Sequence, residues 1–94
     1  MSETSQAVRK RFVFRGWVQG VGFRWRAAKA ASLYGCTGWV RNEWDGSVTM
    51  ELQGSEEQIR QVLAAMDGSR YIRIESMDCR QIPPDEDERG FHAR

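Results

Sequence analysis

Alternating apolar and polar positions predict four β-strands in this chain of 94 residues. Phe12, Phe14 and Val18 fall on one face of the first strand, the pattern of a half-buried strand. An Asp-Gly step between the second and third strands is typical of a hairpin turn. A Pro-Pro pair ends the fourth, because proline donates no ladder hydrogen bond. The predicted strands cover residues 11–18, 36–42, 48–53 and 71–80.

Two other segments repeat with the period of a helix. Over residues 23–34 the apolar positions recur at offsets of 4, 7, 8 and 11, and Gly35 follows as a typical C-terminal cap. Ser55 and Gln58 form a capping box at the start of a second helix. Its apolar positions recur at i, i+3, i+4 and i+7, and we expect Gly68 to end it.

The order β-α-β-β-α-β indicates an α+β fold. Two helices on one face of an antiparallel sheet bury the apolar faces together, in a ferredoxin-like βαββαβ sandwich. Residues 90–94 could add a fifth strand at an edge, and the sequence leaves their pairing open. We expect a single domain over residues 1–94, with residues 1–8 flexible.

The net charge of +1 conceals an uneven distribution. Residues 1–50 hold eight basic and three acidic side chains, whereas residues 51–94 hold six basic and ten acidic ones. An anion site is therefore expected in the first half. The four consecutive carboxylates at 85–88 predict a solvated loop, since they lack the stepped spacing of calcium ligands.

Several classes of protein are excluded by what the chain lacks. No apolar run approaches the roughly 20 residues that span a bilayer, and residues 1–11 hold no apolar signal region, so we expect a cytoplasmic protein with no membrane partner. Cys36 and Cys79 form no CxxC pair; we expect two buried thiols, while a disulfide between them stays open. His92 is the only histidine, which argues against a catalytic triad and a metal site.

The segment between the first strand and the first helix is the strongest candidate for chemistry. Its glycines let successive backbone N–H groups point at one spot beside the positive end of the helix, an arrangement that binds anions. Arg24 adds a planar guanidinium that fits two phosphate oxygens. On local spacing alone, a tight turn beside a surface cation explains the same residues equally well.

Asn42, where a strand reaches the hairpin, is a second candidate. Its amide can orient a water molecule but cannot take its proton. Taken alone, it reads more simply as a turn residue bonded to its own backbone. The tryptophans are expected to serve packing rather than base stacking; they are Trp17, Trp25, Trp39 and Trp44.

The two candidate segments form a recognisable pair. Residues 16–24 read GWVQGVGFR, and residues 38–54 read GWVRNEWDGSVTMELQG. Together, in this order, they resemble the two signatures of the acylphosphatase family. The resemblance extends from the first strand to Phe91 and implies the same βαββαβ sandwich that the periodicity predicts. One departure is Ala93, where a bulkier aliphatic side chain is expected, and it bears only on the last strand.

The resemblance implies an enzyme that hydrolyses small acyl phosphates to a carboxylate and inorganic phosphate. It implies that Arg24 clamps the phosphate and that Asn42 holds the attacking water. The phosphate is further held by the main-chain amides of Gln19, Gly20, Val21, Gly22 and Phe23. We expect a monomer without metal or cofactor, and inorganic phosphate as product and competitive inhibitor.

Three other functions remain open. An RNA-binding sheet shares the topology and would display Phe12 and Phe14, but residues 47–53 hold no aromatic partner, so we expect no nucleic-acid binding. A sensor domain could bind a phosphorylated metabolite at the loop without turning it over. The chain also resembles the acylphosphatase-like N-terminal domain of larger maturation proteins, although an end at Arg94 would bring no further domain.

Overall fold

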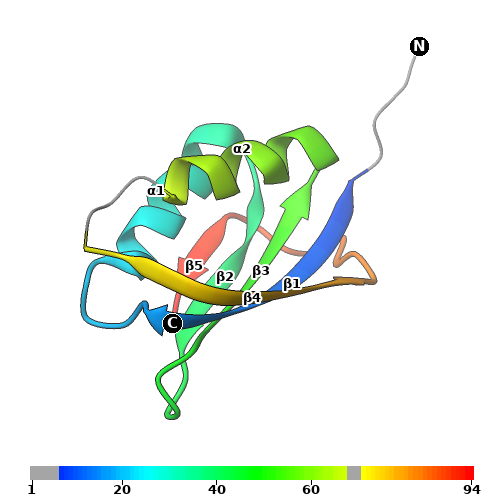
Figure 1. Cartoon of the computed structure of the whole chain (residues 1–94). Helices are drawn as coiled ribbons and strands as arrows, with labels where there is room; N and C mark the ends of the chain where they lie inside the picture. The colour runs from blue at the N-terminus through cyan, green and yellow to red at the C-terminus, as the bar shows by residue number, and fades with distance from the viewer. Residues whose placement is uncertain (1–6, 68–70) are drawn as a thin grey trace.

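The secondary structure follows the predicted order of elements in a computed structural model that describes residues 7–67 and 71–94 (Figure 1). The elements are β1 (Val8–Trp17), α1 (Phe23–Tyr34), β2 (Thr37–Asn42), β3 (Val48–Gly54), α2 (Glu56–Met66), β4 (Arg73–Ile82) and β5 (Phe91–Ala93). The helix predicted over residues 23–34 has the same bounds in the structure. The capping box of α2 is confirmed, with the Ser55 side chain accepting from the Gln58 amide.

Six of the eight strand bounds differ from the prediction, by one to three residues. β1 begins at Val8, three residues before the expected start, because its backbone pairs with Gly54 of β3. β4 ends at Ile82, directly before the prolines, rather than at residue 80. Residues 1–6 and the expected helix end at Gly68 lie outside the described residues.

The strands form one sheet in the order β4-β1-β3-β2-β5. The pairs β1/β3, β1/β4 and β2/β3 are antiparallel, whereas β5 runs parallel to β2. The ferredoxin-like sandwich is therefore confirmed, and the pairing of residues 90–94, which the sequence leaves open, is parallel to β2. Because β4 runs antiparallel to β2, a strand that reverses direction after β4 runs parallel to β2. β5 is such a strand, since the chain crosses to the other edge of the sheet before it forms. Ala93 does not prevent the pairing, which places it opposite Val40.

Both helices cover the same face of the sheet, and the core lies between the two layers (Figure 1). Phe12 and Phe14 of β1 are each 1% exposed, and the ring of Phe14 meets that of Phe23 edge-on at 5.0 Å. The inner face of α1 carries Ala27 and Ala31, whose small side chains let the helix approach the sheet closely. This packing fixes the start of α1 against the end of β1.

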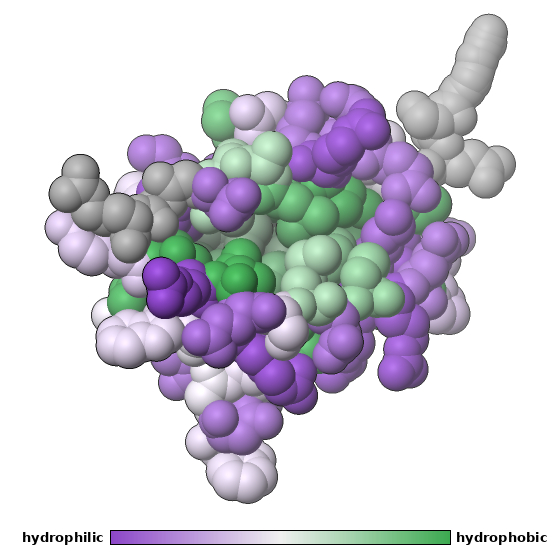
Figure 2. Space-filling view, viewed as in Figure 1, coloured by the Kyte–Doolittle hydropathy of each residue, from purple (hydrophilic) through white to green (hydrophobic). Residues whose placement is uncertain are grey.

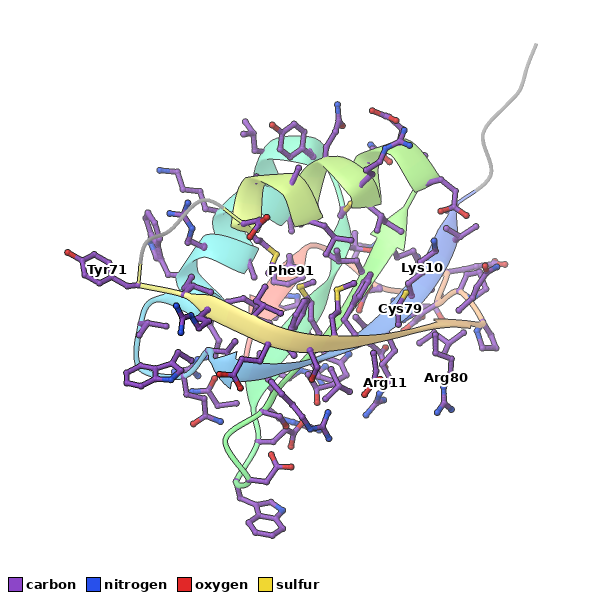
Figure 3. The ribbon with its side chains drawn as sticks, in the orientation of Figure 1. Lys10, Arg11, Tyr71, Cys79, Arg80 and Phe91 are labelled. Atoms are coloured by element: carbon purple, nitrogen blue, oxygen red, sulfur yellow. The ribbon has the colours of Figure 1, made fainter. Side chains whose placement is uncertain are left out.

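The helices leave a strip of the sheet uncovered beside the edge strand β4. Apolar surface gathers there, between α2 and β4 (Figure 2). Cys79 lies in this strip, near Lys10 (Figure 3), and is exposed, whereas Cys36 is buried. Both thiols are free. The expectation of two buried thiols is therefore wrong for Cys79, because no helix covers this edge of the sheet.

The acidic segment 85–88 is not solvated along its whole length, which corrects a second expectation. The Glu88 carboxylate turns inward and pairs with Arg9 of β1. Their side chains are 11% and 5% exposed, respectively. A buried guanidinium requires a counter-charge, and Glu88 supplies one from a loop that is distant in sequence.

Candidate active site

The loop between β1 and α1 has the geometry of an anion-binding turn. Gly20 and Gly22 have φ angles of 73° and 81°, in the left-handed region that side chains other than glycine adopt only under strain. A Cβ added at either residue would meet nothing within 4 Å. The glycines therefore serve the backbone conformation rather than close packing, and the space before the loop is open.

The N-termini of the two helices differ in how their amides are used. In α2, the Ser55 side chain caps the helix, and Glu56 and Glu57 place two carboxylates in its first turn. In α1, the N-cap is Gly22, no side chain caps the helix, and the first turn holds no acidic residue. The first-turn amides of α1 therefore remain available to an external anion at the positive end of the helix dipole.

Arg24 lies in the first turn of α1 and is exposed. Its Nη1 donates to the main-chain oxygen of Arg94 at 2.9 Å, and the amide of Arg94 donates to the carbonyl of Val40 at 2.8 Å. These two hydrogen bonds hold the Arg24 side chain near Val40 of β2, two residues before that strand ends at Asn42. The sequence carries no local signal for the contact, because it depends on the parallel pairing of β5.

Asn42 is the last residue of β2 and pairs with Val48. Its Oδ1 is buried and has no hydrogen-bond partner. The interpretation of Asn42 as a turn residue therefore does not apply to this oxygen. Leaving a buried acceptor unsatisfied costs about 1–3 kcal/mol, so the free Oδ1 of Asn42 suits a hydrogen-bonding ligand.

The hairpin after Asn42 is closed by its own hydrogen bonds. The Glu43 amide donates to the Ser47 carbonyl at 2.8 Å, and the Gly46 amide donates to the Glu43 carbonyl at 3.2 Å. The Ser47 hydroxyl and amide both donate to the Asp45 carboxylate, at 2.6 and 2.9 Å, and these bonds hold the pKa of Asp45 below its usual value. The turn thus keeps its shape without help from the loop between β1 and α1 (residues 18–22, the glycine loop).

Gln19 connects the glycine loop to this hairpin through its side chain. Its Nε2 donates to the Glu43 carbonyl at 2.6 Å and to the Ser47 carbonyl at 2.9 Å. From the sequence, only the main-chain amide of Gln19 is expected to belong to the site. The side-chain role was missed, because nothing in the local sequence indicates which carbonyls lie opposite a loop glutamine.

The positive charge of the first half is largely paired in the structure. Five of its basic side chains bind carboxylates: Arg9 and Arg11 bind Glu51, Lys10 binds Glu56, Arg15 binds Asp78, and Arg41 binds Glu43. Figure 3 shows Arg11 on the side of the sheet away from the helices. A broad positive field is therefore weaker than the charge count suggests, which leaves Arg24 and the loop amides as the candidate groups for anion binding.

The two phenylalanines of β1 are not displayed as an RNA-binding sheet would display them. Phe12 and Phe14 are buried beneath the helices. Trp39 is 7% exposed and lies under the guanidinium of Arg94, 4.7 Å from the ring centroid, as a packing role requires. The packing role is wrong for three tryptophans that are largely exposed: Trp17 at 69%, Trp25 at 63% and Trp44 at 98%.

No helix among the described residues is long and apolar enough to cross a membrane. Within residues 7–67 and 71–94, no group of three His, Cys, Asp or Glu side chains could hold a metal ion. The candidate site thus comprises the loop amides, Arg24 and Asn42.

Comparison with known proteins decides the family. A sequence model described as Acylphosphatase matches residues 10–93. The chain belongs to the acylphosphatase family. It is a hydrolase that acts on acyl phosphates, and the match spans both candidate segments.

Bacterial acylphosphatases resemble the chain over nearly their whole length. The acylphosphatase of Bifidobacterium longum is 38% identical over 96 residues, which cover 100% of this chain and 99% of that protein. The acylphosphatase of Clostridium acetobutylicum is 39% identical over 77 residues, covering 81% and 85% of the two chains.

Solved acylphosphatase structures share the fold. The crystal structure of acylphosphatase from Bacillus subtilis superposes with a TM-score of 0.85 at 27% identity, covering 93% of this chain and 98% of that one. Full-length HypF, crystallised in a phosphate- and nucleotide-bound form, contains the same fold in 12% of its chain, at 22% identity. That second likeness concerns the fold alone.

Proposed function

We propose that the glycine loop and Arg24 hold the phosphoryl group of an acyl phosphate and that Asn42 orients the attacking water. The observation that carries the proposal is the uncapped start of α1, where Gly20 and Gly22 adopt positive φ angles before open space. The main-chain amides of Gln19, Gly20, Val21, Gly22 and Phe23 would donate to the phosphate oxygens. Preorganised amides stabilise such charge without moving during the reaction.

Arg24 supplies the charged part of the phosphate site. A guanidinium presents its donors in a fork that matches two phosphate oxygens. The bond from its Nη1 to the main-chain oxygen of Arg94 fixes the side chain beside β2. Because the guanidinium is held before substrate arrives, little side-chain entropy is lost on binding.

The reaction needs no protein acid or base. The leaving group is a carboxylate, which is stable as an anion near neutral pH. The water oxygen forms a bond to phosphorus in line with the departing carboxylate, the bond between phosphorus and the acyl oxygen breaks, and the water proton passes to a phosphoryl oxygen. The free Oδ1 of Asn42 would accept a hydrogen bond from that water. This bond would orient the water so that a lone pair on the water oxygen points at phosphorus.

We further propose that the enzyme works without a metal or cofactor, as a monomeric single domain in the cytoplasm. The chemistry supports metal independence, since amides and one guanidinium can carry the developing charge. Activity that survives prolonged chelation with EDTA tests that part. Elution at the mass of one 10.8 kDa chain in size-exclusion chromatography tests the monomer.

Phosphate release from benzoyl phosphate, measured with and without inorganic phosphate, tests the proposal as a whole. We expect turnover, with inorganic phosphate inhibiting competitively. A sensor domain would bind phosphate and leave benzoyl phosphate intact, so absence of turnover beside measurable phosphate binding would favour that second function.

A further inference from the structure

We propose that the Gln19 side chain is a positioning residue, which sets the distance between the bound phosphorus and the water held by Asn42. This inference rests on the proposed function. The glycine loop and Asn42 lie on different elements. In-line attack therefore requires a fixed distance and direction between the phosphate held by the loop and the water held by Asn42. A misplacement of 1 Å can cost about 100-fold in rate.

Gln19 is well placed to fix that relation. Its main-chain amide belongs to the loop, while its side-chain Nε2 donates to the carbonyls of Glu43 and Ser47. Glu43 directly follows Asn42, and Ser47 directly precedes Val48, the residue that pairs with Asn42 in the sheet. The two bonds therefore hold both chains of the hairpin at the level of Asn42.

The bonds from Gln19 are not needed to close the hairpin. The Glu43 amide already donates to the Ser47 carbonyl, and the Gly46 amide to the Glu43 carbonyl. Each carbonyl uses its second lone pair for Gln19. The contact therefore adds a connection between the loop and the hairpin rather than the shape of either one.

The side-chain amide suits this position because both of its partners are acceptors. A single NH2 group offers two donors and reaches both carbonyls at once. A methionine of similar length would fill the space and make neither bond. A carboxylate would face two carbonyl oxygens without a proton to share, and the electrostatic repulsion would push the loop away from the hairpin.

The test compares Gln19→Met with the wild type in benzoyl phosphate hydrolysis. Gln19→Met keeps the main-chain amide, and Arg24 is unchanged. We expect kcat to fall by about 10- to 100-fold, while the inhibition constant of inorganic phosphate changes by less than about 3-fold. An unchanged kcat, or a loss confined to phosphate affinity, would overturn the inference.

Gln53→Met is the matched control. Gln53 also donates from its Nε2 to a main-chain carbonyl in another segment, that of Asp85, at 2.9 Å. It lies on β3 away from the glycine loop. We expect its kcat to match that of the wild type. An equal fall in both variants would show that any lost glutamine contact has this effect, and would overturn the positioning role.

Two further readouts separate positioning from general loosening. In an Asn42→Ala background, Gln19→Met should change kcat by less than about 3-fold, because Gln19 acts through the water that Asn42 holds. Full additivity of the two effects would contradict this.

The pH dependence of Gln19→Glu gives the second readout. Its kcat relative to the wild type should rise as the pH falls toward 5, since a protonated carboxyl regains one donor. A ratio that does not change with pH would contradict the positioning role.

The outcomes also separate this inference from the function on which it rests. A wild-type protein that releases no phosphate would end the proposed function first. A wild-type enzyme that is active and sensitive to Asn42→Ala, beside an unaffected Gln19→Met variant, would remove the role of Gln19 alone.

Discussion

Arg9 and Glu88, 79 positions apart in the sequence, form a two-pronged ion pair in which Nη1 lies 2.7 Å from Oε1 and Nη2 lies 3.0 Å from Oε2. Arg9 also donates from Nε to Glu51 at 2.9 Å. The hydrogen bond to Glu88 raises the pKa of Arg9, although burial opposes the shift. The pair fastens the loop after β4 to the outer face of the sheet, on the path by which the chain reaches β5.

Replacing Arg9 should destabilise the fold strongly. Arg9→Met removes a guanidinium that is 5% exposed. The Glu88 carboxylate, which is 11% exposed, then loses its ion-pair partner. Breaking such a pair by removing one member costs about 3–5 kcal/mol. Urea unfolding at pH 7 measures the change. The neighbouring Lys10→Met is the control, because its exposed pair with Glu56 should contribute at most about 1 kcal/mol; equal losses in the two variants would contradict the prediction.

The Glu88 carboxylate should also contribute a pH-dependent part of the stability. Burial alone would raise the pKa of Glu88, but the hydrogen bond and charge of Arg9 outweigh burial and lower it. A carboxyl whose pKa is lowered on folding stabilises the protein above its unfolded pKa of about 4.3. That contribution is lost as the pH falls through the lower, folded value.

Glu88→Gln should therefore be less stable than the wild type at pH 7, and the difference should shrink as the pH falls from 7 to 3. Urea midpoints across that range measure it. The exposed neighbour Glu86 provides the control, Glu86→Gln, which should stay close to the wild type throughout. A difference that is constant with pH would show that charge on Glu88 is not responsible.

The two thiols should react at very different rates. Cys79 is exposed on the edge strand, whereas burial raises the pKa of Cys36 to about 11. Thiolates are the reactive form, so Cys36 is inert near neutral pH on two counts. Ellman's reagent should therefore label one thiol rapidly in the native protein and the second only in urea. Cys79→Ser should remove the fast phase, and a fast phase that persists would contradict the assignment.

The elements that depend on local sequence were predictable. The helix over residues 23–34 is flanked by Gly22 and Gly35, whose φ angles are positive, and the Ser55 capping box forms as expected. The predictions that are wrong concern residues whose environment depends on partners distant in sequence. Neither the pairing of Glu88 with Arg9 nor the exposure of Cys79 can be read from neighbouring residues, because both follow from which strand lies at which edge.

The candidate site divides in the same way. The loop and Arg24 are signalled by glycine spacing and by the resemblance to acylphosphatases. The side-chain bonds of Gln19 and the contact of Arg24 with Arg94 require the folded hairpin and β5 to be in place. Sequence therefore predicts the groups of the site, while the structure adds the contacts that hold them relative to one another.

Arg24→Gln should abolish detectable binding of inorganic phosphate together with turnover. The substitution removes the charge and the forked donors and leaves the loop amides intact. Isothermal titration with phosphate measures binding without relying on activity. Lys29→Gln, an exposed cation on the same helix, should bind phosphate like the wild type. Phosphate affinity retained in Arg24→Gln would rule out the clamp.

Asn42→Ala should separate catalysis from binding. Because Asn42 is proposed to orient water and not phosphate, the inhibition constant of inorganic phosphate should remain near that of the wild type. The loss of one preorganised group in the transition state should lower kcat by a factor of about 10² to 10³, equivalent to about 2.7–4 kcal/mol. Steady-state kinetics with benzoyl phosphate gives both constants, and the urea midpoint of the variant checks that the hairpin still folds. An unchanged kcat in a stable variant would show that the free Oδ1 has no part in the reaction.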